Sequence, residues 1–222
     1  VSRLIERGYY VRLIPTNPSD RQPDCFPIPK RIQLLPLDRK RSLRKQLPKA
    51  DILITQHWPF AQDLSSSQGK WLCPIQTEEG ITKDEITGMK RQPDGWLPNS
   101  TGCADILVKR GVCRDRITIV QNGLNHDWFH TGAYPKTVDV FTQLNLKKRR
   151  KGGPETLEVL ERLHKLGFKI EAFGQRNESD LGRVPDWLPM HSVGPLQLPP
   201  LYQRSRVYFY GAILDGFANS VL

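Results

Sequence analysis

A run of basic residues, KKRRKGG at 147–153, stands directly before a stretch with helical spacing. The first backbone N–H groups of a helix point toward a ligand, and lysine and arginine side chains neutralise an anion. Two consecutive glycines at the end of the run let the backbone approach a ligand closely. The run predicts an anion-binding loop with Lys151, Arg150 and Lys147 as candidate ligands, and a solvated surface loop is the alternative.

Four candidate positions fall just after predicted strands or in the loops beyond them: Lys151, Gly174, Gly194 and Asp215. Ligands of open α/β sheets sit at the carboxyl ends of the strands, so one crevice can collect all four positions. Asp215 opens the final stretch, DGFANSVL. For this stretch an ordinary strand-to-helix turn, capped by Asn219 or Ser220, is the alternative.

Eight short segments rich in β-branched and aromatic residues predict the strands that position these groups. They are 11–15, 51–57, 71–75, 95–98, 117–121, 138–143, 169–173 and 206–210. Several are continuous apolar runs, such as DILIT and ITIV, which is typical of parallel strands covered on both faces. The segment 17–37 carries five prolines and little periodicity, so we expect a long surface loop there.

Two helices are predicted between the strands. The segment 100–111 has Ser100 or Thr101 as its N-cap and Gly111 as its stop. The segment 153–167 has a proline in its first turn, acids early and Gly167 as its stop. Four leucines of this second helix are expected to face the core: Leu157, Leu160, Leu163 and Leu166. The alternation of strands and helices predicts an α/β fold.

The chain has 222 residues, of which 38% are hydrophobic and 25% charged, which is typical of a globular protein. A break after the segment ITIVQNG predicts a domain boundary near 133–137, which gives domains 1–134 and 135–222. The four cysteines form no CxxC pair, so we expect reduced thiols and no metal site.

The formal net charge is +10 and the pI is about 9.6. This balance favours a polyanion, an anionic membrane surface or a phosphorylated ligand as the partner. A non-enzymatic polyanion-binding protein, such as a nucleic-acid-binding protein, is therefore the alternative function. Zinc-finger, RNP and basic-zipper signatures are absent, so nucleic acid is not the expected partner. No apolar run approaches the roughly 20 residues of a membrane span.

Several motifs follow one another in an order that resembles one enzyme family. The second half contains, in order, RRKGG, EAFG, LPPLYQRSRVYFYGA and DGFANSVL. The first half contains DGWLPNSTGCADILVKRGVCRDRITIVQNGLNHDWF, in which Asn122, Gly123 and Phe129 are the matched positions. The series is similar to the retaining glycosyltransferases of the group-1 (family four) class, which have the GT-B fold, and it covers nearly the whole chain.

The resemblance implies two Rossmann-like domains, both incomplete. The first strand and glycine loop of the family would precede Val1, and the second acid of the family's loop would fall one position past Leu222. We therefore expect that the isolated 222 residues lack activity. The implied reaction moves a sugar from a nucleotide-sugar donor to a glycan or lipid-linked acceptor with retention, as in polysaccharide biosynthesis. It implies no cofactor or metal, since the nucleotide-sugar is the substrate.

The resemblance also implies roles for the donor-side residues. Lys151 matches the lysine that contacts the donor diphosphate, with Arg150 or Lys147 as the second cation, because Leu146 stands where the family has arginine. Asp215, one methylene shorter than the family's glutamate, would accept hydrogen bonds from sugar hydroxyls and is the first catalytic candidate. Further donor-binding positions are Gly174, Gly194, Gly216, Phe217, Ala218 and Asn219.

On the acceptor side, the resemblance implies that His57, Glu78 and Glu79 face the interdomain cleft. His57 ends the predicted strand 51–57, and the two glutamates follow the predicted strand 71–75. Glu78 is the second catalytic candidate. The alternative for His57 is a histidine packed in the fold, and the alternative for Glu78 and Glu79 is a solvated loop. The expected location is cytoplasmic, with peripheral contact at the anionic inner membrane face as a further expectation from the basic charge.

Overall fold

The computed structural model describes residues 2–14, 31–35, 38, 43–55, 69–77, 81–132, 134–147, 149–174, 184–213, 215 and 218. The chain forms two compact units, Val1–Gln121 (unit 1) and Asn122–Leu222 (unit 2). The segment after Gln121 packs on unit 2: Gln203 Nε2 donates to the His130 carbonyl oxygen at 2.9 Å, and the rings of Phe129 and Tyr202 meet edge to face. The domain boundary predicted near 133–137 stays a prediction.

Unit 2 is built on a four-stranded parallel sheet in the order β8-β7-β6-β9. Its strands are β6 (Val138–Gln143), β7 (Ile170–Phe173), β8 (Met190–His191) and β9 (Ser205–Phe209). The central strand β6 carries apolar side chains or threonine at most positions, and Phe141 and Thr142 are fully buried. The burial of β6 agrees with the expectation of parallel strands covered on both faces. The run DILIT does not meet that expectation, because Ile52 and Ile54 are 52% and 60% exposed.

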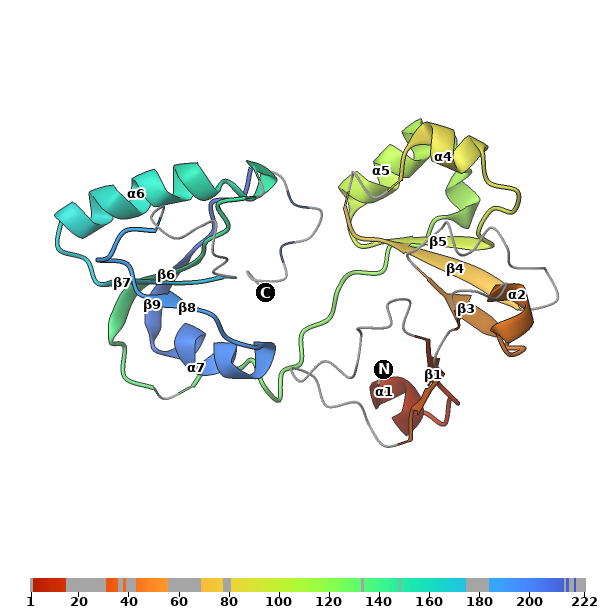
Figure 1. Cartoon of the computed structure of the whole chain (residues 1–222), viewed down its shortest axis with the longest axis horizontal. Helices are drawn as coiled ribbons and strands as arrows, with labels where there is room; N and C mark the ends of the chain where they lie inside the picture. The colour runs from red at the N-terminus through yellow and green to blue at the C-terminus, as the bar shows by residue number, and fades with distance from the viewer. Residues whose placement is uncertain are drawn as a thin grey trace. The chain divides into compact units, whose positions relative to one another are not determined.

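Two helices cover opposite faces of this sheet (Figure 1): α6 (Gly153–Lys165) and α7 (Leu198–Gln203). Leu160 of α6 is buried against Val140 and Ile170, and Leu157 and Leu163 pack around it. The prediction that Leu166 faces the core is wrong, because its side chain is 74% exposed. Leu166 is the C-cap residue of the helix, where the chain turns away through Gly167 and the helical spacing no longer applies.

Helix α7 and the short 3₁₀ helix η6 (Pro195–Gln197) before it were not predicted. The prolines of α7 stand in its first turn, where a missing N–H leaves no helix hydrogen bond unmade. Tyr202 of α7 lies among Phe141, Phe173 and Tyr208 of the sheet, with ring centroids between 5.1 and 6.0 Å from its own. An aromatic cluster therefore fills the α7 side of the sheet.

Unit 1 contains a three-stranded parallel sheet in the order β3-β4-β5 and a separate parallel pair, β1-β2. Its strands are β1 (Arg12–Leu13), β2 (Gln33–Leu34), β3 (Ile52–Ile54), β4 (Lys70–Ile75) and β5 (Gly95–Pro98). Its helices are α1 (Ser2–Glu6), α2 (Leu43–Gln46), α4 (Lys83–Thr87), α5 (Thr101–Lys109) and the 3₁₀ helix η3 (Arg114–Arg116). Trp71, Trp96 and Cys103 are fully buried in its core, and burial raises the pKa of the Cys73 thiol to about 12.

The predicted α/β fold is confirmed, with two differences in unit 1. The predicted strand 117–121 is reduced to a single bridge between Ile117 and Trp96. The predicted surface loop 17–37 is wrong near its end, because Gln33 and Leu34 pair with β1 as strand β2. The prolines that suggested a loop all stand outside these two residues, so they do not interrupt the pairing.

The charge of Asp94 contributes to the stability of unit 1. Its Oδ2 atom accepts hydrogen bonds of 2.8 Å from the Trp71 backbone N–H and from the Arg91 guanidinium. The Trp71 N–H lowers the pKa of Asp94, as does Arg91, and together they outweigh burial, which acts in the opposite direction. A depressed folded pKa means that this contribution is present above the unfolded pKa of about 3.9 and is lost as the pH falls through the folded value.

We expect Asp94→Asn to lower the free energy of unfolding by at most about 1 kcal/mol at pH 7, because the amide keeps the shape and loses the charge. The side chain is 46% exposed, so solvent screens part of the interaction. The difference from the wild type should shrink as the pH falls below the unfolded pKa of about 3.9 and through the folded pKa. Urea unfolding of both proteins at several pH values measures it. A difference that persists unchanged at pH 2 would show that the charge of Asp94 is not the cause.

Candidate functional site

The basic run forms the 3₁₀ helix η4 (Arg149–Lys151) and leads directly into α6. The chain turns at Gly152, which has φ +59° and serves as the N-cap of α6. The Gly152 N–H donates to the Arg149 carbonyl oxygen at 2.9 Å, and its own carbonyl oxygen accepts from Thr156 at 2.8 Å. The loop therefore places Lys151 immediately before the N-terminus of a 13-residue helix.

A second segment, which follows β9, packs against this loop. A Cβ atom at Gly152 would lie 2.0 Å from the Gly211 carbonyl oxygen, so glycine is needed for the close approach as well as for the turn. The Ile213 N–H donates to the Arg150 carbonyl oxygen at 3.0 Å. Since β6 and β9 are parallel neighbours, both segments leave the carboxyl edge of the sheet.

This packing brings Lys151, Tyr210 and Asp215 together. Lys151 Nζ donates to Asp215 Oδ2 across 64 residues of sequence, and the two side chains are only 20% and 14% exposed. The Tyr210 hydroxyl donates to the same carboxylate oxygen and accepts from Lys151 Nζ at 3.3 Å. These contacts bring Lys151 and Asp215 into one cluster, which we call the Lys151 cluster (Lys151, Tyr210 and Asp215).

The charges of the Lys151 cluster support one another. Burial alone would raise the pKa of Asp215, but hydrogen bonds from Lys151 and Tyr210 and the nearby charges of Lys151 and Arg150 hold it below its usual value. Burial and the Asp215 carboxylate raise the pKa of Tyr210 well above its usual range. At neutral pH the cluster therefore presents a carboxylate and a neutral phenol beside the lysine.

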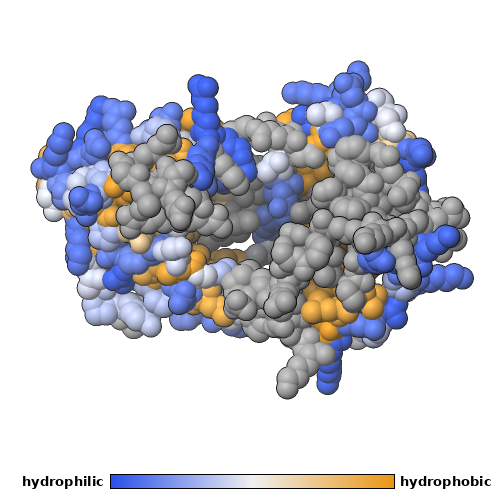
Figure 2. Space-filling view, viewed as in Figure 1, coloured by the Kyte–Doolittle hydropathy of each residue, from blue (hydrophilic) through white to orange (hydrophobic). Residues whose placement is uncertain are grey.

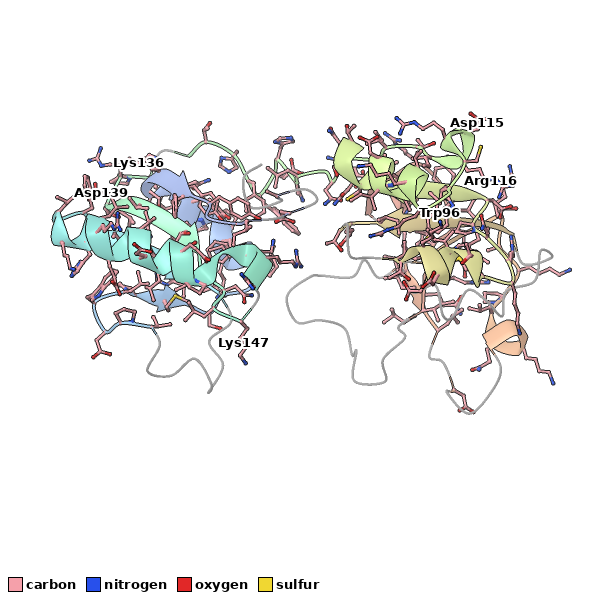
Figure 3. All side chains as sticks on the ribbon, turned by 90° about the horizontal axis from the view of Figure 1, so that it is seen from above. Trp96, Asp115, Arg116, Lys136, Asp139 and Lys147 are labelled. Atoms are coloured by element: carbon pink, nitrogen blue, oxygen red, sulfur yellow. The ribbon has the colours of Figure 1, made fainter. Side chains whose placement is uncertain are left out.

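Gly174, Gly194 and Lys147, three other described candidates, lie in surroundings different from those of the Lys151 cluster. Gly174 directly follows β7, and a Cβ atom there would lie 2.3 Å from the Leu144 carbonyl oxygen, so the glycine permits close packing at the carboxyl edge. Gly194 is the N-cap of η6, and its N–H donates to Gln197 Oε1 at 3.0 Å. Lys147 is exposed at the end of unit 2 where α6 begins, opposite the end that carries Lys136 and Asp139 (Figure 3).

Within the described part of the chain, no hydrogen bond or ion pair joins Lys147, Gly194 or Ala218 to the Lys151 cluster. Leu146, at the position where the family has arginine, packs against the core of unit 2. Six predicted residues lie outside the described residues and stay predictions: His57, Glu78, Glu79, Gly216, Phe217 and Asn219.

Sequence reasoning missed Tyr210 and a second charged group beneath α7. Tyr210 lies inside the predicted strand 206–210, whereas β9 ends at Phe209, so no sequence signal marks it as a residue beyond a strand end. The buried Glu171 of β7 bonds Arg204, and its Oε2 lies 2.7 Å from His191 Nε2. This group ties the end of α7 to β7 and β8, and its members are too far apart in sequence to be paired by inspection.

The described residues of unit 1 line an open hollow of about 830 Å³ at the amino ends of β3 and β4. Its lining includes Lys49, Lys70 and the paired Arg91 and Asp94. Ligands of α/β sheets bind at the carboxyl ends of the strands. The hollow lies at the opposite edge of the sheet, so we propose no ligand for it. Among the residues that the structure describes, no group of three His, Cys, Asp or Glu side chains is placed to hold a metal ion.

Where they are coloured, the visible faces of both units are mostly hydrophilic, with small hydrophobic patches on each (Figure 2). None of the helices in the described ranges is long and apolar enough to cross a bilayer.

No protein-family model matches the sequence, and no curated protein matches it. Solved structures do resemble the fold. Sucrose-phosphate synthase of Thermosynechococcus elongatus superposes with a TM-score of 0.66 at 14% identity, covering 98% of this chain and 69% of that one. HepE of Anabaena, solved with UDP and glucose, gives 0.61 at 9% identity, covering 82% and 61%. TarM of S. aureus, in a complex that includes UDP, gives 0.60 at 13% identity, covering 78% and 39%.

The chain is an α/β protein of two Rossmann-like units. It has the GT-B fold, which the structural neighbours share. The chain spans 61% of the length of HepE and 39% of that of TarM. Because the identities are between 9% and 14%, the likeness establishes the fold, and activity has to be argued from the site.

Proposed function

We propose that this chain belongs to a glycosyltransferase that takes a sugar from a nucleotide-sugar donor, and that unit 2 binds the donor. One observation carries the proposal: Lys151 and Asp215, which are distant in sequence, meet at the carboxyl edge of a parallel sheet beside the start of α6. Two of the neighbours with this fold were solved with UDP, which supports a nucleoside diphosphate as the ligand class.

The chemistry of the cluster fits such a donor. When the glycosidic bond to the diphosphate breaks, negative charge develops on phosphate oxygens, and a lysine beside a helix N-terminus stabilises it. Arg150 is the second cation of the loop, half-buried and close enough to Asp215 to lower the pKa of its carboxyl. The Asp215 carboxylate accepts hydrogen bonds from sugar hydroxyls. Neither role needs a metal or a cofactor.

The finer parts of the proposal are retention of the anomeric configuration and a glycan or lipid-linked acceptor. They rest on the motif series RRKGG, EAFG and DGFANSVL, which resembles the retaining family. Peripheral contact with an anionic membrane rests on the net charge of +10 alone and is also a proposal.

Slow donor hydrolysis tests retention without knowledge of the acceptor. Any glucose that the chain releases from UDP-glucose should be α-glucose at first, which proton NMR distinguishes from β-glucose before the two equilibrate. The Lys151→Ala variant is the control and should release at least tenfold less. Initial release of β-glucose would refute retention. Binding of UDP without any release would limit the proposal for this chain to donor binding.

A further inference from the structure

The hydroxyl of Tyr210 lies between the two charged side chains of the Lys151 cluster. It accepts a hydrogen bond from Lys151 Nζ at 3.3 Å and donates one to Asp215 Oδ2. Its ring also lies near the ammonium group, which is 5.8 Å from the ring centroid. The ring of Tyr208 stacks beside it at 6.3 Å, so the position of Tyr210 is fixed by the end of β9 and by a neighbouring side chain.

A bound diphosphate would create a conflict at this site. The diphosphate and the Asp215 carboxylate are both anions, and both would bind the same lysine. Lys151 has three N–H donors, of which one is directed to Asp215 and another to Tyr210. A phosphate oxygen that takes the longer bond leaves the carboxylate beside a second negative charge, which favours movement or protonation of Asp215.

Tyr210 is suited to resolve this conflict because it is a neutral donor. The raised pKa of its hydroxyl keeps it protonated at physiological pH, so it continues to donate to Asp215 after the lysine has engaged a phosphate. Aspartate is also a short side chain, and a partner that reaches it from β9 restricts where its carboxylate can lie. The charged and titratable groups around the carboxylate are Lys151, Arg150 and Tyr210, with Tyr208 behind Tyr210.

We propose that Tyr210 is a positioning residue of the donor site, whose hydroxyl holds the Asp215 carboxylate in place while Lys151 binds the diphosphate. The inference rests on the proposed function of the Lys151 cluster. The two residues then have different roles. Lys151 binds the diphosphate, whereas Tyr210 affects sugar binding through Asp215. Loss of Tyr210 should therefore affect a nucleotide-sugar and spare the nucleotide.

The test compares UDP and UDP-glucose binding by calorimetry in the wild type, Tyr210→Phe and Asp215→Asn. We expect Tyr210→Phe to weaken UDP-glucose binding about tenfold and UDP binding less than twofold, which corresponds to the loss of one charge-assisted hydrogen bond. The acid limb of UDP-glucose binding should move to higher pH. Tyr134→Phe, at an exposed tyrosine of unit 2, is the matched control and should change neither affinity.

A double variant separates positioning from a general loss of structure. If Tyr210 acts through Asp215, Tyr210→Phe should add less than twofold to the effect of Asp215→Asn on UDP-glucose. Equal weakening of both ligands by Tyr210→Phe, or independent effects in the double variant, would overturn the inference. So would an Asp215→Asn protein that still binds UDP-glucose normally, even if Tyr210→Phe fails to fold. Failure of the wild type to bind either UDP or GDP would instead refute the proposed function.

Discussion

Gly152→Ala is expected to destabilise unit 2 by at least about 2 kcal/mol and to abolish nucleotide binding. The left-handed conformation at Gly152 alone costs an alanine roughly 1–2 kcal/mol. In addition, the new Cβ atom would stand 2.0 Å from the Gly211 carbonyl oxygen, a backbone atom that can move only if the segment after β9 moves. That movement separates Tyr210 and Asp215 from Lys151.

Gly167→Ala is the matched control at the other end of α6. Gly167 has φ +85°, but a Cβ atom there has no heavy atom within 4 Å. We expect it to lose only the conformational part, about 1 kcal/mol, and to bind UDP normally. Urea unfolding and UDP calorimetry on the two variants measure the difference. Equal destabilisation would show that the contact between Gly152 and Gly211 does not hold the loop.

Lys151→Ala should weaken the binding of UDP and GDP by about 10- to 100-fold, because hydrogen bonds to charged groups contribute roughly 1.5–3 kcal/mol. The lysine side chain is mostly buried, so screening by solvent is limited. The base is not specified by the cluster, and comparison of UDP with GDP identifies it.

Lys165→Ala removes one positive charge from the exposed last turn of the same helix and serves as the control for net charge. It should change either affinity less than twofold at 150 mM salt, where charges more than about 8 Å apart are largely screened. If both lysine variants weaken binding equally, the nucleotide is attracted by overall charge, which favours the polyanion-binding alternative.

The main elements of the site are predictable from the sequence because they depend on local chemistry and one rule of topology. The run KKRRKGG combines cations, flexible backbone and a helix start within seven residues. Asp215 follows a strand-like segment, and the carboxyl ends of parallel strands meet at one edge. The structure places Lys151 and Asp215 together for that reason.

The remaining parts depend on contacts that local patterns do not contain. Tyr210 belongs to an apolar, strand-like run, and its hydroxyl acquires a role only because the loop at Gly152 packs beside it. Glu171 lies in an apolar strand, where its burial depends on Arg204 and His191 from later segments. Leu166 continues the helical spacing of α6, but the helix ends before it. The acceptor-side predictions at His57, Glu78 and Glu79 stay predictions.

The most direct test of the central claim is where UDP binds on the chain. We would titrate UDP into ¹⁵N-labelled protein and follow the backbone amide signals by NMR. The largest shifts should come from 149–156 and 210–213, with little change among the β4, β5 and α5 amides of unit 1. Shifts concentrated in unit 1, or a folded chain whose spectrum responds to neither UDP nor GDP, would contradict a donor site on the Lys151 cluster.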